Sequence, residues 1–165
     1  MPLKNSFNQI SRFDTFSQLV ENMKEMEEDP LADAGTNVVI FRGNPDANLM
    51  IIGEAPGPQE NIEGKPFVGR AGKLLDKILK AVDFDPKEDV FITNAVFRMP
   101  PGEGERDFRK PSKQEIDYYN QYLMELIRLV DPLIILLAGN IACQSLIDQT
   151  GITKLRGEWR QFQNY

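Results

Sequence analysis

Two flexible loops with one aromatic residue between them form the part of the chain best suited to chemistry. The first loop, residues 53–57, holds two glycines and a proline and follows the apolar run at 49–52. Glycine permits backbone conformations that bring N–H donors close to a flat or anionic ligand. The second loop, residues 69–72, follows Phe67 and opens an amphipathic segment. From the first five residues alone, an ordinary strand-to-helix turn is an equally open interpretation.

Further motifs follow the first loop in a fixed order. GEAPG at 53–57 is followed by GKPFVGRAGKLLDKIL, FITNAV, MPPG and LRGEW. No single motif is specific, but from about Asn37 to Trp159 the combination closely resembles the family 4 uracil-DNA glycosylases. The resemblance implies an enzyme that hydrolyses the N-glycosidic bond of uracil in DNA during base excision repair. It also implies that family's three-layer α/β/α sandwich around a mainly parallel sheet.

The resemblance assigns substrate-binding roles to two residues. Phe67 matches the aromatic residue that lies against the uracil ring and replaces the stacking lost when the nucleotide leaves the duplex. Asn94 matches the asparagine that accepts from uracil N3–H and donates to O4, a pattern that cytosine reverses, so that cytosine leaves buried groups unpaired. Without the surrounding motifs, Phe67 would be a core residue and Asn94 a turn former or cap.

The implied catalytic groups lie in and just after the first loop. Gly53, Glu54 and Ala55 resemble the turn that holds uracil, where N–H donors stabilise negative charge on the departing base. Ala55 stands where the best-known uracil glycosylases carry a water-activating aspartate. We therefore expect Glu60, together with Glu54, to be the catalytic acids, with Glu60 orienting the water or stabilising a cationic sugar. A plain surface acid is the alternative for Glu60.

Basic residues near the motifs predict contacts to DNA phosphates, which set register but not base identity. Arg70, Lys73 and Arg156 are the candidates, since GRAG and LRG match the family. Five others could contact phosphate or be ordinary solvated side chains: Arg98, Arg106, Arg109, Lys110 and Lys154. The net charge of -6 is unexpected for a DNA-binding protein. Residues 1–36 account for most of it, with seven acidic against three basic side chains.

The chain departs from the family at the positions of its four cluster-binding cysteines. The family generally holds a 4Fe–4S cluster, and alignment puts Met26, Asp29, Arg98 and Tyr119 at these positions. The single cysteine, Cys143, and the lack of any histidine also remove the usual ligand sets for zinc. We therefore expect no metal and no cofactor.

A second departure concerns the family's histidine–proline motif, which should follow LRGEW and does not occur before Tyr165. We expect a single domain over residues 1–165 that is C-terminally incomplete and has weak or no activity. The alternative is a non-catalytic relative that binds DNA or uracil through Phe67 and Asn94. A nucleotide-binding protein is disfavoured, because the Rossmann glycine pattern and the P-loop lysine are missing.

The rest of the chain must place these loops at one edge of a sheet. Apolar runs predict strands at 37–41, 49–52, 90–96 and 133–137, and helical periodicity predicts helices at 16–26, 70–82, 112–130 and 141–147. A buried stripe is expected on the second helix, formed by Leu74, Leu75, Ile78, Leu79 and Val82. Residues 98–114 are expected to form a long basic loop, and Ser112 and Glu115 stand at capping-box spacing at the start of the helix that follows. Alternating strands and helices favour a parallel sheet, with the site outside the strands' carboxyl ends.

The composition also leads to expectations about localisation and oligomeric state. No apolar run reaches membrane-spanning length, and the first residues lack the hydrophobic block of a signal peptide. We expect a monomer in the cytoplasm, associated with the nucleoid.

Overall fold

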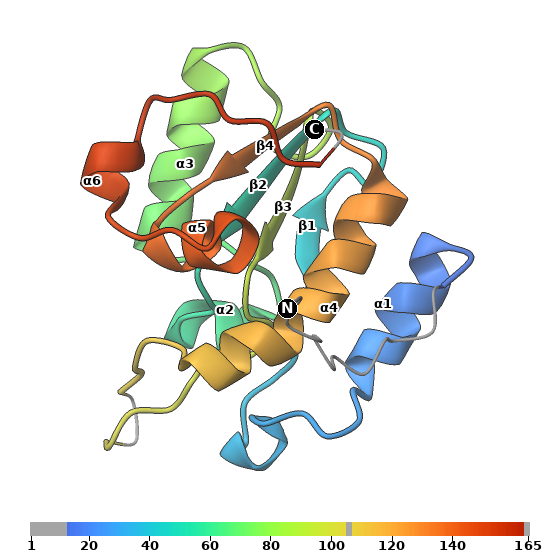
Figure 1. The fold of residues 1–165 in the computed structure, drawn as a ribbon, viewed down its shortest axis with the longest axis vertical. Helices are drawn as coiled ribbons and strands as arrows, with labels where there is room; N and C mark the ends of the chain where they lie inside the picture. Colours follow the sequence, from blue (N-terminus) through green and yellow to red (C-terminus); the bar gives the residue numbers. More distant parts are fainter. Residues whose placement is uncertain (1–12, 105–106, 164–165) are drawn as a thin grey trace, which may run out of the picture.

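A four-stranded sheet forms the middle layer of the computed structural model, which describes residues 13–104 and 107–163 (Figure 1). Its strands are β1 (Phe41–Gly43), β2 (Leu49–Gly53), β3 (Val90–Asn94) and β4 (Ile134–Leu137), in the order β1-β3-β2-β4. β2 pairs in parallel with β3 and β4, whereas β1 pairs antiparallel with β3. The predicted, mainly parallel sheet is confirmed.

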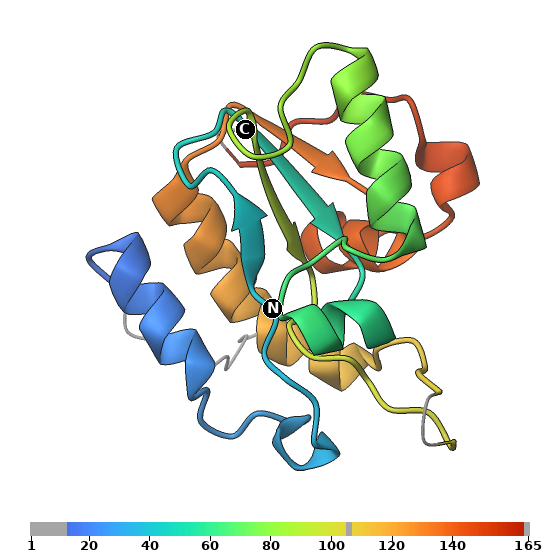
Figure 2. The same cartoon turned by 180° about the vertical axis from the view of Figure 1, so that it is seen from behind.

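Helices cover both faces of this sheet (Figures 1 and 2). The described ranges contain α1 (Phe16–Lys24), α2 (Pro58–Glu63), α3 (Arg70–Ala81), α4 (Lys113–Val130), α5 (Asn140–Ile147) and α6 (Ile152–Leu155). Because successive strand residues point to opposite faces, Met50 and Ile52 join the core formed with α1, α4 and α5. Ile51 and Ile92 instead pack with α3. These are the three layers of the predicted α/β/α sandwich. No helix in the described ranges has the length and apolar character needed to cross a bilayer.

Local capping explains where two of the helices begin. Ser112 and Glu115 form the predicted capping box at the start of α4: the Ser112 hydroxyl accepts from the Glu115 N–H, and the Glu115 carboxylate accepts from the Ser112 N–H. Thr15 and Gln18 do the same for α1. Such caps each stabilise a helix by about 1 kcal/mol.

The first strand lies later in the chain than predicted. β1 begins at Phe41, because the preceding residues bond elsewhere: the Val39 N–H donates to Phe97 O at 2.7 Å, and Asn37 bonds to Asn61 beside α2. The strand ends at Gly43, where a Cβ would lie 2.1 Å from Val90 O. Close approach to β3 therefore requires glycine at this position.

The buried stripe predicted for the helix at 70–82, which is α3, is only partly buried. Leu79 is buried and Leu75 half-buried against the sheet. In contrast, Leu74, Ile78 and Val82 are 59%, 53% and 60% exposed. Helical periodicity defines an apolar face, but the sheet beneath α3 covers only the Leu75–Leu79 side of it. The prediction was wrong for the other three residues.

Candidate active site

The two predicted site strands end side by side. Gly53, the last residue of β2, is paired in register with Asn94, the last residue of β3. The Ala95 N–H continues the pairing by donating to Gly53 O at 2.9 Å. Since both strands run in the same direction, these residues lie at one edge of the sheet, where ligand sites of α/β proteins form.

Gly53 is the meeting point of the Phe67 ring and the Asn94 carboxamide. The position that a Cβ would take on Gly53 lies 2.4 Å from Phe67 Cζ and 2.6 Å from Asn94 Oδ1. Any side chain at this position would collide with both groups. The absence of a side chain therefore allows an aromatic ring and a carboxamide to converge.

The Asn94 carboxamide keeps its hydrogen-bonding capacity. The residue is only 2% exposed, and in the described part of the chain no hydrogen bond joins its side chain to another protein group. Among the described residues, the fully buried side-chain polar atom without a partner is Thr36 Oγ1, so the polar atoms of Asn94 still reach solvent. Its donor and its acceptor are both available to a ligand.

The turn after Gly53 also has unused donors. Within residues 13–104 and 107–163, the N–H groups of Glu54 and Ala55 donate to no backbone acceptor, whereas Glu54 O accepts from the Val96 N–H at 3.1 Å. Both residues are half-buried. The Glu54 side chain takes part in none of the ion pairs seen among the described residues. This turn can thus offer two N–H donors and a carboxylate to a bound molecule.

The Glu60 carboxylate is engaged by the backbone. It accepts from the N–H groups of Gly57 at 3.1 Å, Val68 at 3.0 Å and Gly69 at 2.8 Å. These bonds tie the start of α2 to the start of α3, and they use both carboxylate oxygens. The geometry gives Glu60 a role in holding loops, which the sequence did not indicate.

Phe67 adopts an unusual backbone conformation. Its φ is +54°, in the left-handed region, which costs a residue other than glycine on the order of 1–3 kcal/mol. Gly72 in α3 packs against this turn so closely that a Cβ would lie 1.8 Å from Phe67 O. Arg42, from β1, also bonds to the turn. The sequence around Arg42 gives no sign of this contact with the Phe67 turn.

Two of the three predicted phosphate-binding residues lie near this edge. Arg70 and Lys73 are exposed in the first turn of α3, directly after the Phe67 turn, and neither joins an ion pair seen among the described residues. Arg156 is exposed beyond α6 and lines a separate cavity beside β4, together with Trp159 and Phe162. The structure therefore groups Arg70 and Lys73 with the site but does not group Arg156 with it.

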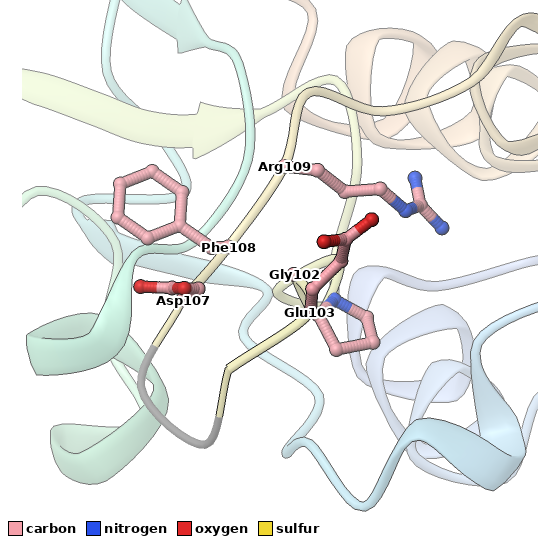
Figure 3. Close-up of a pocket in the computed structure, with 6 residues that line it drawn as sticks. Gly102, Glu103, Asp107, Phe108 and Arg109 are labelled. Atoms are coloured by element: carbon pink, nitrogen blue, oxygen red, sulfur yellow. The ribbon is translucent and has the colours of Figure 1, made fainter.

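The predicted basic loop contains a short hairpin (Figure 3). The Gly102 N–H donates to Asp107 O at 2.8 Å, and Pro101 and Phe108 form an isolated antiparallel bridge. The side chains of Phe108 and Arg109 point to opposite sides of the backbone. Arg109 binds both oxygens of Glu115, at 2.9 and 2.6 Å. Arg106 lies outside the described residues. Arg109 is thus paired with Glu115 and is not freely available to DNA phosphates. The same is true of Arg98, which pairs with Asp29.

Arg98 belongs to a buried polar network at the family's cluster positions. The Asp29 carboxylate, whose side chain is 0% exposed, accepts from Arg98 Nε at 2.6 Å, from Leu31 N–H at 2.9 Å and from the Tyr119 hydroxyl. Arg98 also donates to Thr36 O. Burial, with the bond to Asp29, raises the pKa of Tyr119 well above its ordinary value, so the hydroxyl remains a donor.

These side chains do not fit an iron–sulfur cluster. Such clusters need thiolates, whereas a guanidinium has no lone pair to give and the Asp29 carboxylate is already occupied by three donors. Met26, at the fourth position, is a buried thioether. Within the described ranges, no three His, Cys, Asp or Glu side chains are grouped so that they could hold a metal ion.

Comparisons with known proteins agree with this arrangement. Residues 40–164 match the family model described as the uracil DNA glycosylase superfamily. The chain is 35% identical over 150 residues to a type-4 uracil-DNA glycosylase of Sulfurisphaera tokodaii, covering 88% of this chain and 66% of that protein. It is 36% identical over 139 residues to the type-4 enzyme of Thermotoga maritima, covering 83% and 69%.

A third relative places the same type of sequence in a much longer protein. A DNA polymerase of Bacillus phage SP01 is 37% identical over 117 residues, covering 71% of this chain but 12% of the polymerase. The chain spans about two thirds of the length of the two glycosylases. From the family match and these identities, the chain belongs to the uracil-DNA glycosylase superfamily.

Proposed function

We propose that this chain hydrolyses the N-glycosidic bond between uracil and deoxyribose in DNA, the first step of base excision repair. The observation that carries the proposal is the convergence of the Phe67 ring and the free Asn94 carboxamide on Gly53. An aromatic face and a reading amide are the two elements that an extruded pyrimidine requires. The type-4 relatives, which are named uracil-DNA glycosylases, support the same activity.

Recognition begins when the uracil nucleotide leaves the stack. Stacking on Phe67 replaces base stacking and contributes about 1–3 kcal/mol. The Asn94 amide accepts from uracil N3–H and donates to O4. Cytosine presents an acceptor at N3 and a donor at its amino group, so with the amide in the orientation that suits uracil its binding leaves two buried groups unpaired and is disfavoured.

Bond cleavage separates charge across the site. As the C1′–N1 bond breaks, negative charge grows on uracil, and the N–H groups of Glu54 and Ala55 stabilise it. Positive charge grows on the sugar, and the carboxylates of Glu54 and Glu60 stabilise this charge electrostatically. Glu54 is better available to orient the water, because the Glu60 oxygens accept three backbone bonds. The water oxygen bonds to C1′, and its proton balances the negative charge on the released base.

DNA is held by its phosphates as well as by the flipped base. Arg70, Lys73 and Arg156 are the proposed phosphate contacts, and the first two lie beside the site. Because the substrate is DNA, the proposed place of action is the nucleoid in the cytoplasm. We propose that the protein acts as a monomer, which light scattering would check.

The proposed activity needs no iron–sulfur cluster. The network of Asp29, Arg98 and Tyr119 links the segment after α1 to α4 and to the segment after β3. It can hold these segments together by hydrogen bonds and an ion pair alone.

Uracil release from a single-stranded oligonucleotide tests the proposal. We expect wild-type protein to release uracil, and Asn94→Ala to lower the rate by about 10²–10³-fold. Asn120→Ala is the matched control, since Asn120 bonds to Ser145 between α4 and α5 and lies outside the site. Failure of the wild type to release uracil at large enzyme excess would contradict the proposal, and retained DNA binding would then indicate a non-catalytic relative.

A further inference from the structure

Arg42 makes three bonds around the Phe67 turn. Its Nε donates to Pro66 O at 2.8 Å, and its Nη2 donates to Phe67 O at 3.0 Å. The same Nη2 donates to Asp76 Oδ1 on α3 at 2.7 Å. The Arg42 side chain is only 14% exposed, so the guanidinium is a fixed part of the fold.

Glu60 holds the other half of the turn. Arg42 donates to the carbonyls of Pro66 and Phe67. Glu60 Oε1 accepts from the N–H groups of the next two residues, Val68 and Gly69. A cation on carbonyls and an anion on amides are both charge-assisted arrangements, which are stronger than neutral hydrogen bonds. One backbone group of each residue from Pro66 to Gly69 is therefore held, the first two by Arg42 and the last two by Glu60.

We propose that Arg42 is a positioning residue of the active site, which together with Glu60 keeps Phe67 in the left-handed conformation that sets its ring against Gly53. This inference rests on the proposed function, in which the Phe67 ring stacks on uracil. The φ of +54° is unfavourable for phenylalanine and persists only if its surroundings enforce it. Release of the carbonyls would let the turn relax and move the ring.

The sheet register explains why Arg42 can reach this turn. β1 is antiparallel to β3, and Arg42 is paired with Ile92. Residues paired across neighbouring strands point to the same face, and Ile92 belongs to the core shared with α3. The Arg42 side chain is thereby directed to the α3 side of the sheet, where Asp76 and the Phe67 turn lie.

The shape of the guanidinium is part of the inference. Arginine presents several donors in a rigid, planar fork, whereas lysine is a flexible point charge. A lysine at position 42 can pair with Asp76 but does not reproduce the two directed bonds to Pro66 O and Phe67 O. Arg42→Lys therefore keeps the positive charge while it removes the two directed bonds to the carbonyls.

The test compares Arg42→Met and Arg42→Lys with Arg128→Met. Arg128 is a matched control, because it pairs with Glu125 and donates to Phe13 O away from the site. For Arg42→Met we expect kcat for uracil release to fall about 10–100-fold, since small misplacements of a substrate-binding group have effects of this size. kcat/KM should fall at least as far, because a displaced Phe67 ring also loses the stacking that holds the extruded base. Arg42→Lys should recover only part of kcat, and Arg128→Met should match wild type.

Hydrogen exchange of the peptide that spans residues 64–70 supplies a readout that does not depend on activity. We expect the amides of Val68 and Gly69 to exchange about tenfold faster in Arg42→Met than in wild type or Arg128→Met. Unchanged kcat together with unchanged exchange would overturn the inference. If wild type releases no uracil, the proposed function fails, and the exchange comparison still decides whether Arg42 holds the turn. If Arg42→Met does not fold, Arg42→Lys carries both measurements.

Discussion

Gly53 and Asn94 stand opposite each other at the ends of β2 and β3, and a Cβ on Gly53 would lie 2.6 Å from Asn94 Oδ1. The same point is 2.4 Å from Phe67 Cζ. Three separate segments thus meet at Gly53, and the following predictions probe this convergence and the groups that support it.

Gly53→Ala should abolish most of the activity while the protein stays folded. The added methyl group displaces the Phe67 ring or the Asn94 amide, and we expect uracil release to fall about 10²-fold or more. Gly35→Ala is the control, because no atom of another described residue, its two chain neighbours aside, lies within 4 Å of its Cβ position. Its left-handed φ of +68° makes that variant less stable but leaves the site intact. Equal activity of Gly53→Ala and wild type would contradict the geometry.

Phe67→Leu should weaken recognition of the base. Leucine keeps an apolar contact but lacks the flat face, so about 1–3 kcal/mol of stacking is reduced and kcat/KM falls by up to about 150-fold. Steady-state rates with a uracil-containing single strand measure this loss. A leucine variant with wild-type kcat/KM would show that the ring does not stack on uracil.

Asp29→Asn should destabilise the fold strongly. Removal of one partner from a buried ion pair costs about 3–5 kcal/mol, because the Arg98 charge is left without its carboxylate. Urea unfolding of Asp29→Asn, Arg98→Met and the double variant measures the coupling, and the double variant should lose less than the two single losses combined. Iron chelators should leave the unfolding curve of wild type unchanged. An iron-dependent absorption band in the purified protein would contradict the account of this network.

Stability should fall at acidic pH partly through Glu115. The hydrogen bond from Arg109, helped by the Ser112 N–H and hydroxyl, holds the pKa of Glu115 below its ordinary value of 4.5. A carboxyl with a lowered folded-state pKa stabilises the fold fully above its unfolded value, and the contribution is lost as pH falls through the folded value. Urea unfolding at neutral and acidic pH should show a smaller pH dependence for Glu115→Gln than for wild type. Asp117→Asn, which alters an exposed pair with Lys113, should show little change.

Local sequence signals predicted the elements that depend on neighbouring residues. The Ser112–Glu115 capping box is a four-residue pattern, and the structure contains it as predicted. Likewise, apolar runs located β2, β3 and β4 closely. β2 ends where its apolar run meets Gly53, whereas β3 ends at Asn94, two residues before the end of the strand predicted over 90–96.

Features set by tertiary packing were not predictable in this way. Arg42 reaches Phe67 only because β1 is antiparallel to β3, and nothing local encodes that register. The exposure of Leu74 depends on how much of α3 the sheet covers, which helical periodicity does not specify. The catalytic role of Glu60 stays a prediction from its motif, while the three backbone bonds that it accepts arise from the approach of α2 to α3, which no local pattern indicates.

Nuclear magnetic resonance of the Asn94 side-chain amide tests whether this carboxamide distinguishes uracil from cytosine. The resonance can be assigned by its loss in Asn94→Ala and then followed while uracil or cytosine is added. We expect a saturable shift with uracil and none with cytosine, because the carboxamide in the orientation that suits uracil offers cytosine no matching donor and acceptor. An unmoved resonance at saturating uracil, or an equal shift with cytosine, would contradict it.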